Sequence, residues 1–186
     1  MEFEDQQQIN LTGSLLIADP SLQDPGFGHS VVLLARHDAA EGATGFIINK
    51  PLGKTVSDLV TLDELDGLSE VPVYLGGPVS TEQLTFASMT WREESGILDY
   101  ETHLSSEDAA HRMQEGFSIR AFVGYSGWSE GQLEGEIQGR SWIVKKPDHS
   151  IAEIESCSED LWGAQLRAMG PYYQMLADLP DDPSLN

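Results

Sequence analysis

This sequence of 186 residues contains a single cysteine, Cys157. A lone cysteine excludes an intramolecular disulfide framework and any zinc or iron–sulfur site that several cysteines would build. Long apolar runs are missing too, since no stretch approaches the ~20 residues that a membrane-spanning helix needs. The fold must therefore rest on a hydrophobic core, for which 40% hydrophobic residues suffice.

Basic residues are also scarce. The chain has 10 Lys and Arg against 31 Asp and Glu, which gives a net charge of −21. Such a surface repels phosphate backbones, and the one adjacent basic pair is Lys145-Lys146. We therefore expect no direct binding to nucleic acid. The acidic surface either keeps the protein soluble or attracts a basic partner.

Recognisable cofactor and metal motifs are missing as well. No Gly-x-x-x-x-Gly-Lys-Ser/Thr stretch exists, and Gly26-Phe27-Gly28 leads to Val31 where a dinucleotide fingerprint has glycine. Among the histidines, His111 and Glu115 have a chelating i, i+4 spacing, but that spacing is also typical of a solvated helix face. We expect neither a cofactor nor a metal.

The first eight residues, Met1–Gln8, are acidic and polar, unlike the basic start and apolar centre of a signal peptide. This start predicts a cytoplasmic protein without a membrane association. We expect flexible segments at 1–10 and 180–186, on either side of a single domain over 11–179. A monomer or a weak homo-oligomer is expected.

Hydrophobic patterning predicts an α+β domain. The predicted strands cover 11–18, 29–36, 44–49, 71–75, 84–89, 119–123 and 141–144, with a brief one around Ile97 and Leu98. The predicted helices cover 55–68, 106–115, 133–137, 158–169 and 172–179. The run His29–Arg36 is continuously apolar after Ser30, which is typical of a strand buried on both faces. Its short connection to 44–49 favours an antiparallel hairpin.

The stretch from Phe122 to Ile137 organises the chain. A buried strand is predicted to break at Gly124 and Gly127, and a short amphipathic helix follows. A strand that enters a helix through a glycine turn is a frequent place for a binding site, and also a frequent structural corner. Both interpretations of Trp128 remain open: a core side chain, or the edge of a site.

Many positions in this pattern resemble the YqgE/AlgH family over about residues 10 to 175. The residues that carry the resemblance are Gly13, Leu16, Pro20, Asp24-Pro25, Phe27, Val31, Gly42-Ala43, Gly45, Asn49-Lys50-Pro51, Gly76-Gly77-Pro78-Val79, Gly124-Tyr125, Gly127-Trp128, Gly131-Gln132-Leu133-Glu134, Trp142 and Trp162.

The resemblance implies a bacterial cytoplasmic protein with a mixed, mostly antiparallel bifurcated sheet and a small barrel, surrounded by helices. It also implies a regulatory role, since some members are described as transcriptional regulators of alginate production. The chain departs from many members after Val79, with Gln83 and Ala87-Ser88 where they carry an Arg and a Leu-His. That departure removes a cation and a base, if these ever served catalysis.

A catalytic alternative rests on Gly124-Tyr125-Ser126-Gly127-Trp128, which approaches the Gly-x-Ser-x-Gly elbow of hydrolases. The motif fails where Trp128 replaces the last glycine. A small-molecule hydrolase with a site at Gly124–Glu136 is thus the alternative hypothesis. Cys157 precedes a predicted helix start, but Glu155, Glu159 and Asp160 oppose its ionisation, so we expect it to be non-catalytic.

The main hypothesis is a non-catalytic binding or regulatory module that acts through a protein or small-ligand partner. One use of the shared positions is architectural, and the other is a groove that Phe27, Asn49, Gly77, Trp128 and Gln132 would form for a peptide or small ligand. The candidate binding residues are Phe27, Asn49, Lys50, Gly76, Gly77, Gly127, Trp128, Gln132 and Glu134.

Overall fold

The structure, a computed structural model, describes residues 9–38, 40–60, 65, 67–153 and 157–179. Its strands are β1 (Leu15–Ala18), β2 (Val31–Asp38), β3 (Gly42–Ile47), β4 (Pro51–Thr55), β5 (Pro72–Leu75), β6 (Val79–Arg92), β7 (Ile97–Leu104), β8 (Ser118–Trp128) and β9 (Trp142–Lys145). Its helices are α1 (Val56–Leu59), α2 (Ser106–Gln114), α3 (Gln132–Gln138), α4 (Leu161–Arg167) and α5 (Pro171–Ala177), with a 3-10 turn, η2 (His149–Ile151).

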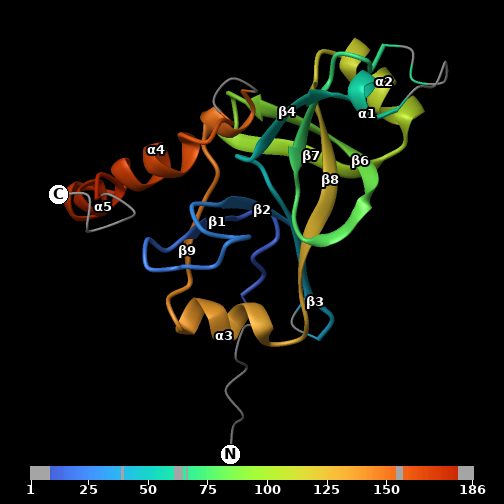
Figure 1. Cartoon of the computed structure of the whole chain (residues 1–186). Coiled ribbons are helices and arrows are strands. Elements are labelled where there is room, and N and C mark those ends of the chain that lie inside the picture. The colour runs from blue at the N-terminus through green and yellow to red at the C-terminus, as the bar shows by residue number, and fades with distance from the viewer. Residues whose placement is uncertain (1–8, 39, 61–64, 66, 154–156, 180–186) are drawn as a thin grey trace, which may run out of the picture.

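The described strands join in one nine-stranded sheet with the order β4-β5-β8-β3-β2-β1-β9. Strand β6 leaves this path because it pairs with both β7 and β8, so the sheet forks at β8 and curls (Figure 1). Only the β5–β8 pair among the described strands is parallel. The predicted class, α+β with a mostly antiparallel bifurcated sheet, is confirmed.

Strand β8 belongs to both branches of the sheet. Its first half pairs with β5 and β6, and its last residues, Ser126 to Trp128, pair with Gly45 to Ala43 of β3. Gly124 lies between the two halves with φ +70°, a conformation that glycine adopts without strain. The predicted break at Gly124 and Gly127 is therefore wrong: the strand bends and continues.

The end of β5 crosses this bend at very short range. A Cβ on Gly76 would lie 2.3 Å from the carbonyl oxygen of Gly124, and one on Gly77 would lie 2.3 Å from that of Tyr125. The Gly76 amide donates to the Val123 carbonyl (2.9 Å), and the Gly76 carbonyl accepts from the Ile47 amide (2.8 Å). Backbone contact at this crossing thus joins β3, β5 and β8.

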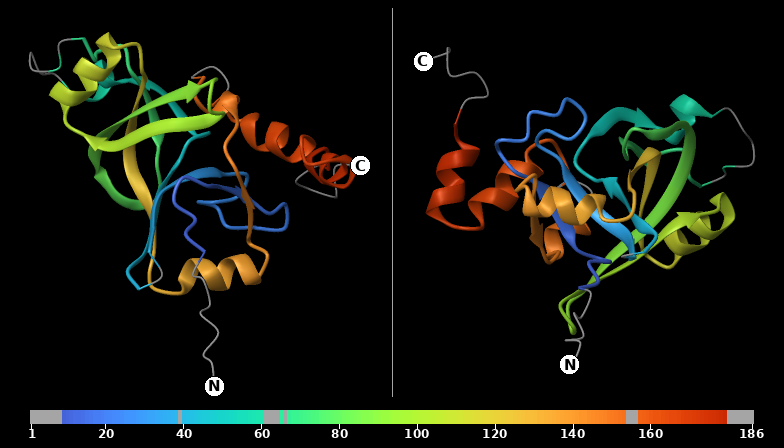
Figure 2. Two further views of the ribbon diagram at one scale, coloured as in Figure 1. Left: turned by 180° about the vertical axis from the view of Figure 1, so that it is seen from behind. Right: turned by 90° about the horizontal axis from the view of Figure 1, so that it is seen from below.

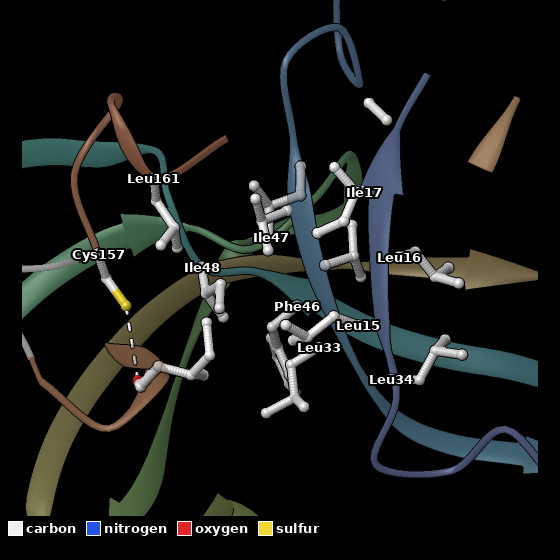
Figure 3. Packing of buried hydrophobic residues seen from close by; sticks show 14 of the residues in the cluster. Leu15, Leu16, Ile17, Leu33, Leu34, Phe46, Ile47, Ile48, Cys157 and Leu161 are labelled. Atoms are coloured by element: carbon white, nitrogen blue, oxygen red, sulfur yellow. Dashed lines mark hydrogen bonds between the residues drawn. The ribbon is translucent and has the colours of Figure 1, made fainter. Parts of the chain in front are cut away.

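The main core lies around β1, β2 and β3 (Figure 3). All four residues of β1 and the first four of β2 are fully buried, as expected for strands covered on both faces. Cys157 and Leu161 enter this core from the C-terminal part of the chain. Burial raises the pKa of the Cys157 thiol, which lies 3.6 Å from the Ile151 carbonyl oxygen.

Several element boundaries differ from the expectation. The helix predicted over 55–68 is α1 alone in its described part, and extended backbone at Val60 ends it. Strand β6 runs well past the predicted 84–89, and Ile97 begins a strand of 8 residues rather than a brief one. Residues 61–64 and 66, and the predicted flexible ends 1–8 and 180–186, lie outside the described residues.

Helices α4 and α5 extend away from the sheet as an arm (Figure 1, Figure 2). Helix α4 is anchored, because the Trp162 indole N–H donates to the Ala18 carbonyl at 2.8 Å. Helix α5 has no buried residue and is tied to α4 by the Arg167–Asp178 ion pair at 2.8 Å. None of the described helices is long and apolar enough to cross a bilayer.

The backbone crossing predicts opposite effects for two Gly→Ala substitutions. Gly76→Ala should lower the free energy of unfolding by about 1–3 kcal/mol or more, because the new methyl group meets backbone that has no room to move. Gly135→Ala should raise it by about 0.5–1 kcal/mol, since that Cβ enters open space within α3. Urea denaturation measures both, and a silent Gly76→Ala would contradict the proposed role of the crossing.

Candidate functional site

The nine candidate binding residues lie in three parts of the fold. Phe27, Trp128, Gln132 and Glu134 lie beside α3. Asn49 and Lys50 lie between β3 and β4. Gly76 and Gly77 lie at the β5–β8 crossing, and Gly127 precedes Trp128 in the part of β8 that pairs with β3. The first two parts are linked, because the Lys50 ammonium donates to the Gly26 carbonyl next to Phe27.

Beside α3, three aromatic rings pack together. The Phe27 ring lies 6.1 Å from that of Trp128 and 5.6 Å from that of Trp142, and the two indoles are 6.0 Å apart. Both indole N–H groups donate to the same oxygen of Glu136, at 2.8 and 2.7 Å. Trp128 is only 6% exposed. Its contacts are those of a core residue fastened to α3 by a shared carboxylate.

Gln132 completes this network at the start of α3. Its amide oxygen accepts from the Ser129 backbone N–H (3.1 Å), and its amide N–H donates to the second oxygen of Glu136 (2.9 Å). Gln132 and Glu136 are four residues apart, so they share one helical face. Within the chain, the Gln132 amide thus joins the preceding turn to Glu136.

Glu134 accepts from His37 across the gap between α3 and β2. The His37 Nε2 lies 2.8 Å from a Glu134 oxygen, while the Leu11 backbone N–H donates to the His37 Nδ1 at 3.2 Å. The proton must then sit on Nε2, and neither ring nitrogen keeps a free lone pair for proton abstraction. A backbone hydrogen bond and the one from His37 lower the pKa of Glu134.

Asn49 and Lys50 hold the loop that precedes β2. The buried Asn49 amide accepts from the Val31 N–H (2.8 Å) and donates to the His29 carbonyl (2.9 Å). The Lys50 ammonium donates to the Gly26 carbonyl at 2.7 Å. Burial lowers the pKa of Lys50, and the nearby Asp24 carboxylate partly offsets this. Both side chains are engaged with backbone.

The serine of the hydrolase alternative is inaccessible. Ser126 is fully buried, and its hydroxyl donates to the Gly76 carbonyl at 3.1 Å. A nucleophile must reach a substrate and have a base within hydrogen-bond distance. Ser126 is instead part of the contact between β5 and β8.

Carboxylates near α3 also have partners other than a metal. Glu134 and Glu136 bind His37 and the two indoles, and no group of three or more metal-ligating side chains occurs in the described part of the chain. His111 and Glu115 lie 3.8 Å apart on an exposed helix face. Ala87 and Ser88, where many family members have Leu-His, are buried in β6.

A small cleft of about 280 Å³ lies on the outer face of β3 and β8. Gly127 and Trp128 are the members of the predicted site that line it, with Thr44, Val79 and Tyr125 beside them. Arg36 at its rim forms an exposed ion pair with Glu41. The cleft is shallow and close to electrically neutral.

Two larger clefts flank α5, and neither was predicted from the sequence. One, of about 390 Å³, is lined by Pro20, Leu22, Gln23, Asp24, Pro25, Gly28, His29, Trp162, Leu176 and Leu179. The other, of about 580 Å³, is lined by Asp19, Pro20, Ser21, Ile137, Arg140, Trp142, Ile143, Tyr172, Tyr173 and Leu176. They share Pro20 and Leu176, so they adjoin. The sequence signal that could have indicated these clefts is the run of tyrosines and leucines over residues 172–179.

The sequence profile of the AlgH-like family matches residues 15–174. The chain belongs to the AlgH-like family. A UPF0301 protein of Cytophaga hutchinsonii is 36% identical, covering 94% of this chain and 98% of that protein. A UPF0301 protein of Streptomyces avermitilis is also 36% identical, covering 95% and 96%.

Two solved structures share the AlgH-like fold. A crystal structure of a Corynebacterium diphtheriae protein has a TM-score of 0.68 at 19% identity, covering 96% of this chain and 95% of that one. The solution structure of the AlgH protein from Pseudomonas aeruginosa has a TM-score of 0.63 at 25% identity, covering 97% and 98%. The resemblance seen in the sequence is thereby confirmed for family and fold.

The aromatic network of this AlgH-like chain predicts a contrast between neighbours. Trp128→Ala should lower the free energy of unfolding by about 3–5 kcal/mol, because a buried aromatic ring is lost from the core. Gln132→Ala should lower it by about 1 kcal/mol or less, since its hydrogen bonds are exposed to water. Thermal and urea melts test both. A mild Trp128→Ala would return this residue to the candidate binding surface.

The His37–Glu134 contact predicts a pH dependence of stability. Because the pKa of Glu134 is lower in the folded chain than its ordinary 4.5, its contribution is complete above 4.5 and is lost as pH falls through the lower folded value. Glu134→Gln should therefore lower the melting temperature at pH 7, differ little from the parent near pH 3, and give a flatter pH profile between the two. Melting temperatures from pH 7 to 3 measure this, with Glu130→Gln as an exposed control. Parallel curves for both variants and the parent would refute the coupling.

Proposed function

We propose that this AlgH-like protein is a non-catalytic binding module that recognises a protein partner through the surface around α5. The observation that carries the proposal is an exposed apolar helix between two clefts. Tyr172 and Met175 of α5 are 64% and 56% exposed and lie three residues apart on one helical face, and Leu179, just beyond the end of the helix, is 57% exposed. Large adjoining apolar groups on a surface are typical of interaction sites.

The internal use of reactive groups supports a non-catalytic role. Ser126, His37 and Glu136, the groups that could serve chemistry near the Gly124–Glu136 stretch, all form hydrogen bonds within the fold. An active site usually keeps such groups open toward a substrate. The burial of Ser126 and the bonding of both His37 ring nitrogens count against the hydrolase alternative.

The construction of α5 supports a role in binding rather than in stability. A helix of 7 residues is marginal by itself, and this one buries none of its side chains. It begins with Pro171 at its first turn, and Arg167 of α4 holds Asp178 just beyond its end. The helix is thus positioned with Tyr173 and Ala177 against the core, while Tyr172 and Met175 stay exposed.

The shape of the clefts favours a polypeptide over a small molecule. Each has the volume of a small-ligand pocket, about 390 and 580 Å³, but they adjoin at Pro20 and Leu176. Because they adjoin, they offer neighbouring places for two side chains of a single segment. A partner segment can use both at once.

Charge supports a protein partner over nucleic acid. Arg36, Arg92, Arg112, Lys145 and Arg167 are five of the ten basic residues, and each forms an ion pair with an acid. Few cations then remain for phosphates, against a net charge of −21. If the protein has the regulatory role that the resemblance implies, we propose that this role passes through a protein partner.

Site-specific photo-crosslinking tests the proposal in the native cells. A benzoylphenylalanine at position 175 should give a discrete cross-linked species, because Met175 projects from α5. The control is the same group at Ile97, which is equally exposed (59%) but lies on β7. Tyr172→Ser should abolish the adduct at 175 while shifting the melting temperature by only a few degrees, since the side chain is exposed. Adducts of equal yield at both positions, or at neither, would contradict the proposal.

A further inference from the structure

Strand β9 has an open edge, because it pairs with β1 and with no other described strand. The Asp19 N–H donates to the Ser141 carbonyl at 2.9 Å, which shows that Ser141 faces β1. Antiparallel pairing alternates, so Ile143 and Lys145 also face β1, whereas the backbone groups of Trp142 and Val144 face outward. These outward N–H and C=O groups bond no other described strand.

The other two unpaired edges among the described strands of the sheet, those of β4 and β7, are less suited to the addition of a further strand. Strand β4 begins with Pro51 and carries Gly53 at φ +64°, which breaks its register with β5. Strand β7 carries Asp99 and Glu101, both in ion pairs with arginines. Strand β9 has no proline, bulge or acid within its four residues. It ends at Lys145-Lys146-Pro147, so its edge suits a short segment.

If a further strand paired with β9, the alternation of side chains along it would determine which of them reach the cleft beside α5. A residue opposite Ile143 would project on the same face of the sheet as Ile143. Ile143 lines the 580 Å³ cleft together with Tyr172, Tyr173 and Leu176 of the α5 arm. Main-chain hydrogen bonds at the edge and an apolar side chain in the cleft would therefore recognise the same segment, as in known cases of strand addition.

The charges around β9 favour an acidic segment of a partner over a second copy of this chain at the strand edge. Arg140 lines the cleft before β9, and Lys146 follows its end; both are exposed and neither forms an ion pair with a described residue. A second copy paired through β9 would bring like charges together, which is destabilising. An acidic segment would instead meet a cation at each end. Screening over about 8 Å makes these near charges count more than the net charge of the chain.

We propose that the partner contributes an extended segment that adds to β9 as a strand, with an apolar side chain in the cleft beside α5 and acidic residues near Arg140 and Lys146. The inference rests on the proposed function, because the same cleft belongs to the α5 surface. It adds a mode of recognition: hydrogen bonding to the Trp142 and Val144 main chain.

A proline tests the edge directly. Val144→Pro removes an outward N–H without breaking a bond to β1, and proline is tolerated at such edge positions. Val144→Ala is the control, because it removes most of the side chain and keeps the N–H. The probe is a phage-displayed library of linear dodecapeptides selected on the full-length protein. Selected peptides should bind Val144→Pro about tenfold or more weakly, and Val144→Ala within about threefold of the parent.

Amide hydrogen exchange on the unmodified protein gives a second readout, which does not depend on how the proline variant folds. The N–H groups of Trp142 and Val144 should exchange rapidly in the free protein and become protected with a selected peptide bound. Unprotected amides in the complex, or a failure to enrich any peptide, would overturn the inference.

The remaining outcomes separate this inference from the proposed function. Peptides that lose affinity with Tyr172→Ser but bind Val144→Pro normally would overturn strand addition and leave the α5 surface in place. Peptides affected by neither variant would overturn both. A dimer in light scattering that Val144→Pro dissociates would assign the edge to a second copy and overturn the partner segment.

Discussion

The contact on which the structure depends is the crossing of two backbones at Gly76-Gly77 and Gly124. A side chain on any of these residues would collide with main-chain atoms 2.3 to 2.4 Å away. The contact allows β8 to leave one branch of the sheet and enter the other. It thereby sets where Trp128 and α3 lie, and the aromatic cluster forms on the far side of the bend.

The polar groups that follow the bend attach α3 to the sheet. Glu136 holds two indoles and Glu134 holds His37, so the carboxylates of a helix without a basic residue gain donors from β8, β9 and β2. Buried indole and imidazole N–H groups need such acceptors. The polar groups of this stretch therefore have a structural role in the fold. The proposed partner surface adjoins them, because Ile137 of α3 and Trp142 line the same cleft as Tyr172 of α5.

Local patterns were enough to predict the buried run of β2, its hairpin with β3 and the amphipathic helices. They failed where a distant segment decides the conformation. From the sequence alone, Gly124 indicates the end of a strand, whereas in the structure the strand bends there against Gly77. His37 and Glu134 form a hydrogen bond although they are 97 residues apart in the sequence. Arg120 is fully buried and donates to the Ile151 carbonyl (2.7 Å), and no pattern of charges in the sequence predicts the burial of this arginine. The groove predicted from Phe27, Asn49, Gly77, Trp128 and Gln132 depends on such long-range contacts too, and it stays a prediction.

Net charge was the most pronounced feature of the composition, yet it does not describe the charge around the proposed binding edge of β9. Ion pairs use five of the ten cations, and Lys50 and Arg120 bond backbone carbonyls. Two of the remaining three, Arg140 and Lys146, flank the edge of β9. Over a screening length of about 8 Å, a ligand at that edge experiences those two cations before the distant acids. A chain with a net charge of −21 can therefore present a cationic edge to an acidic segment, and its overall charge then serves to keep non-cognate anions away.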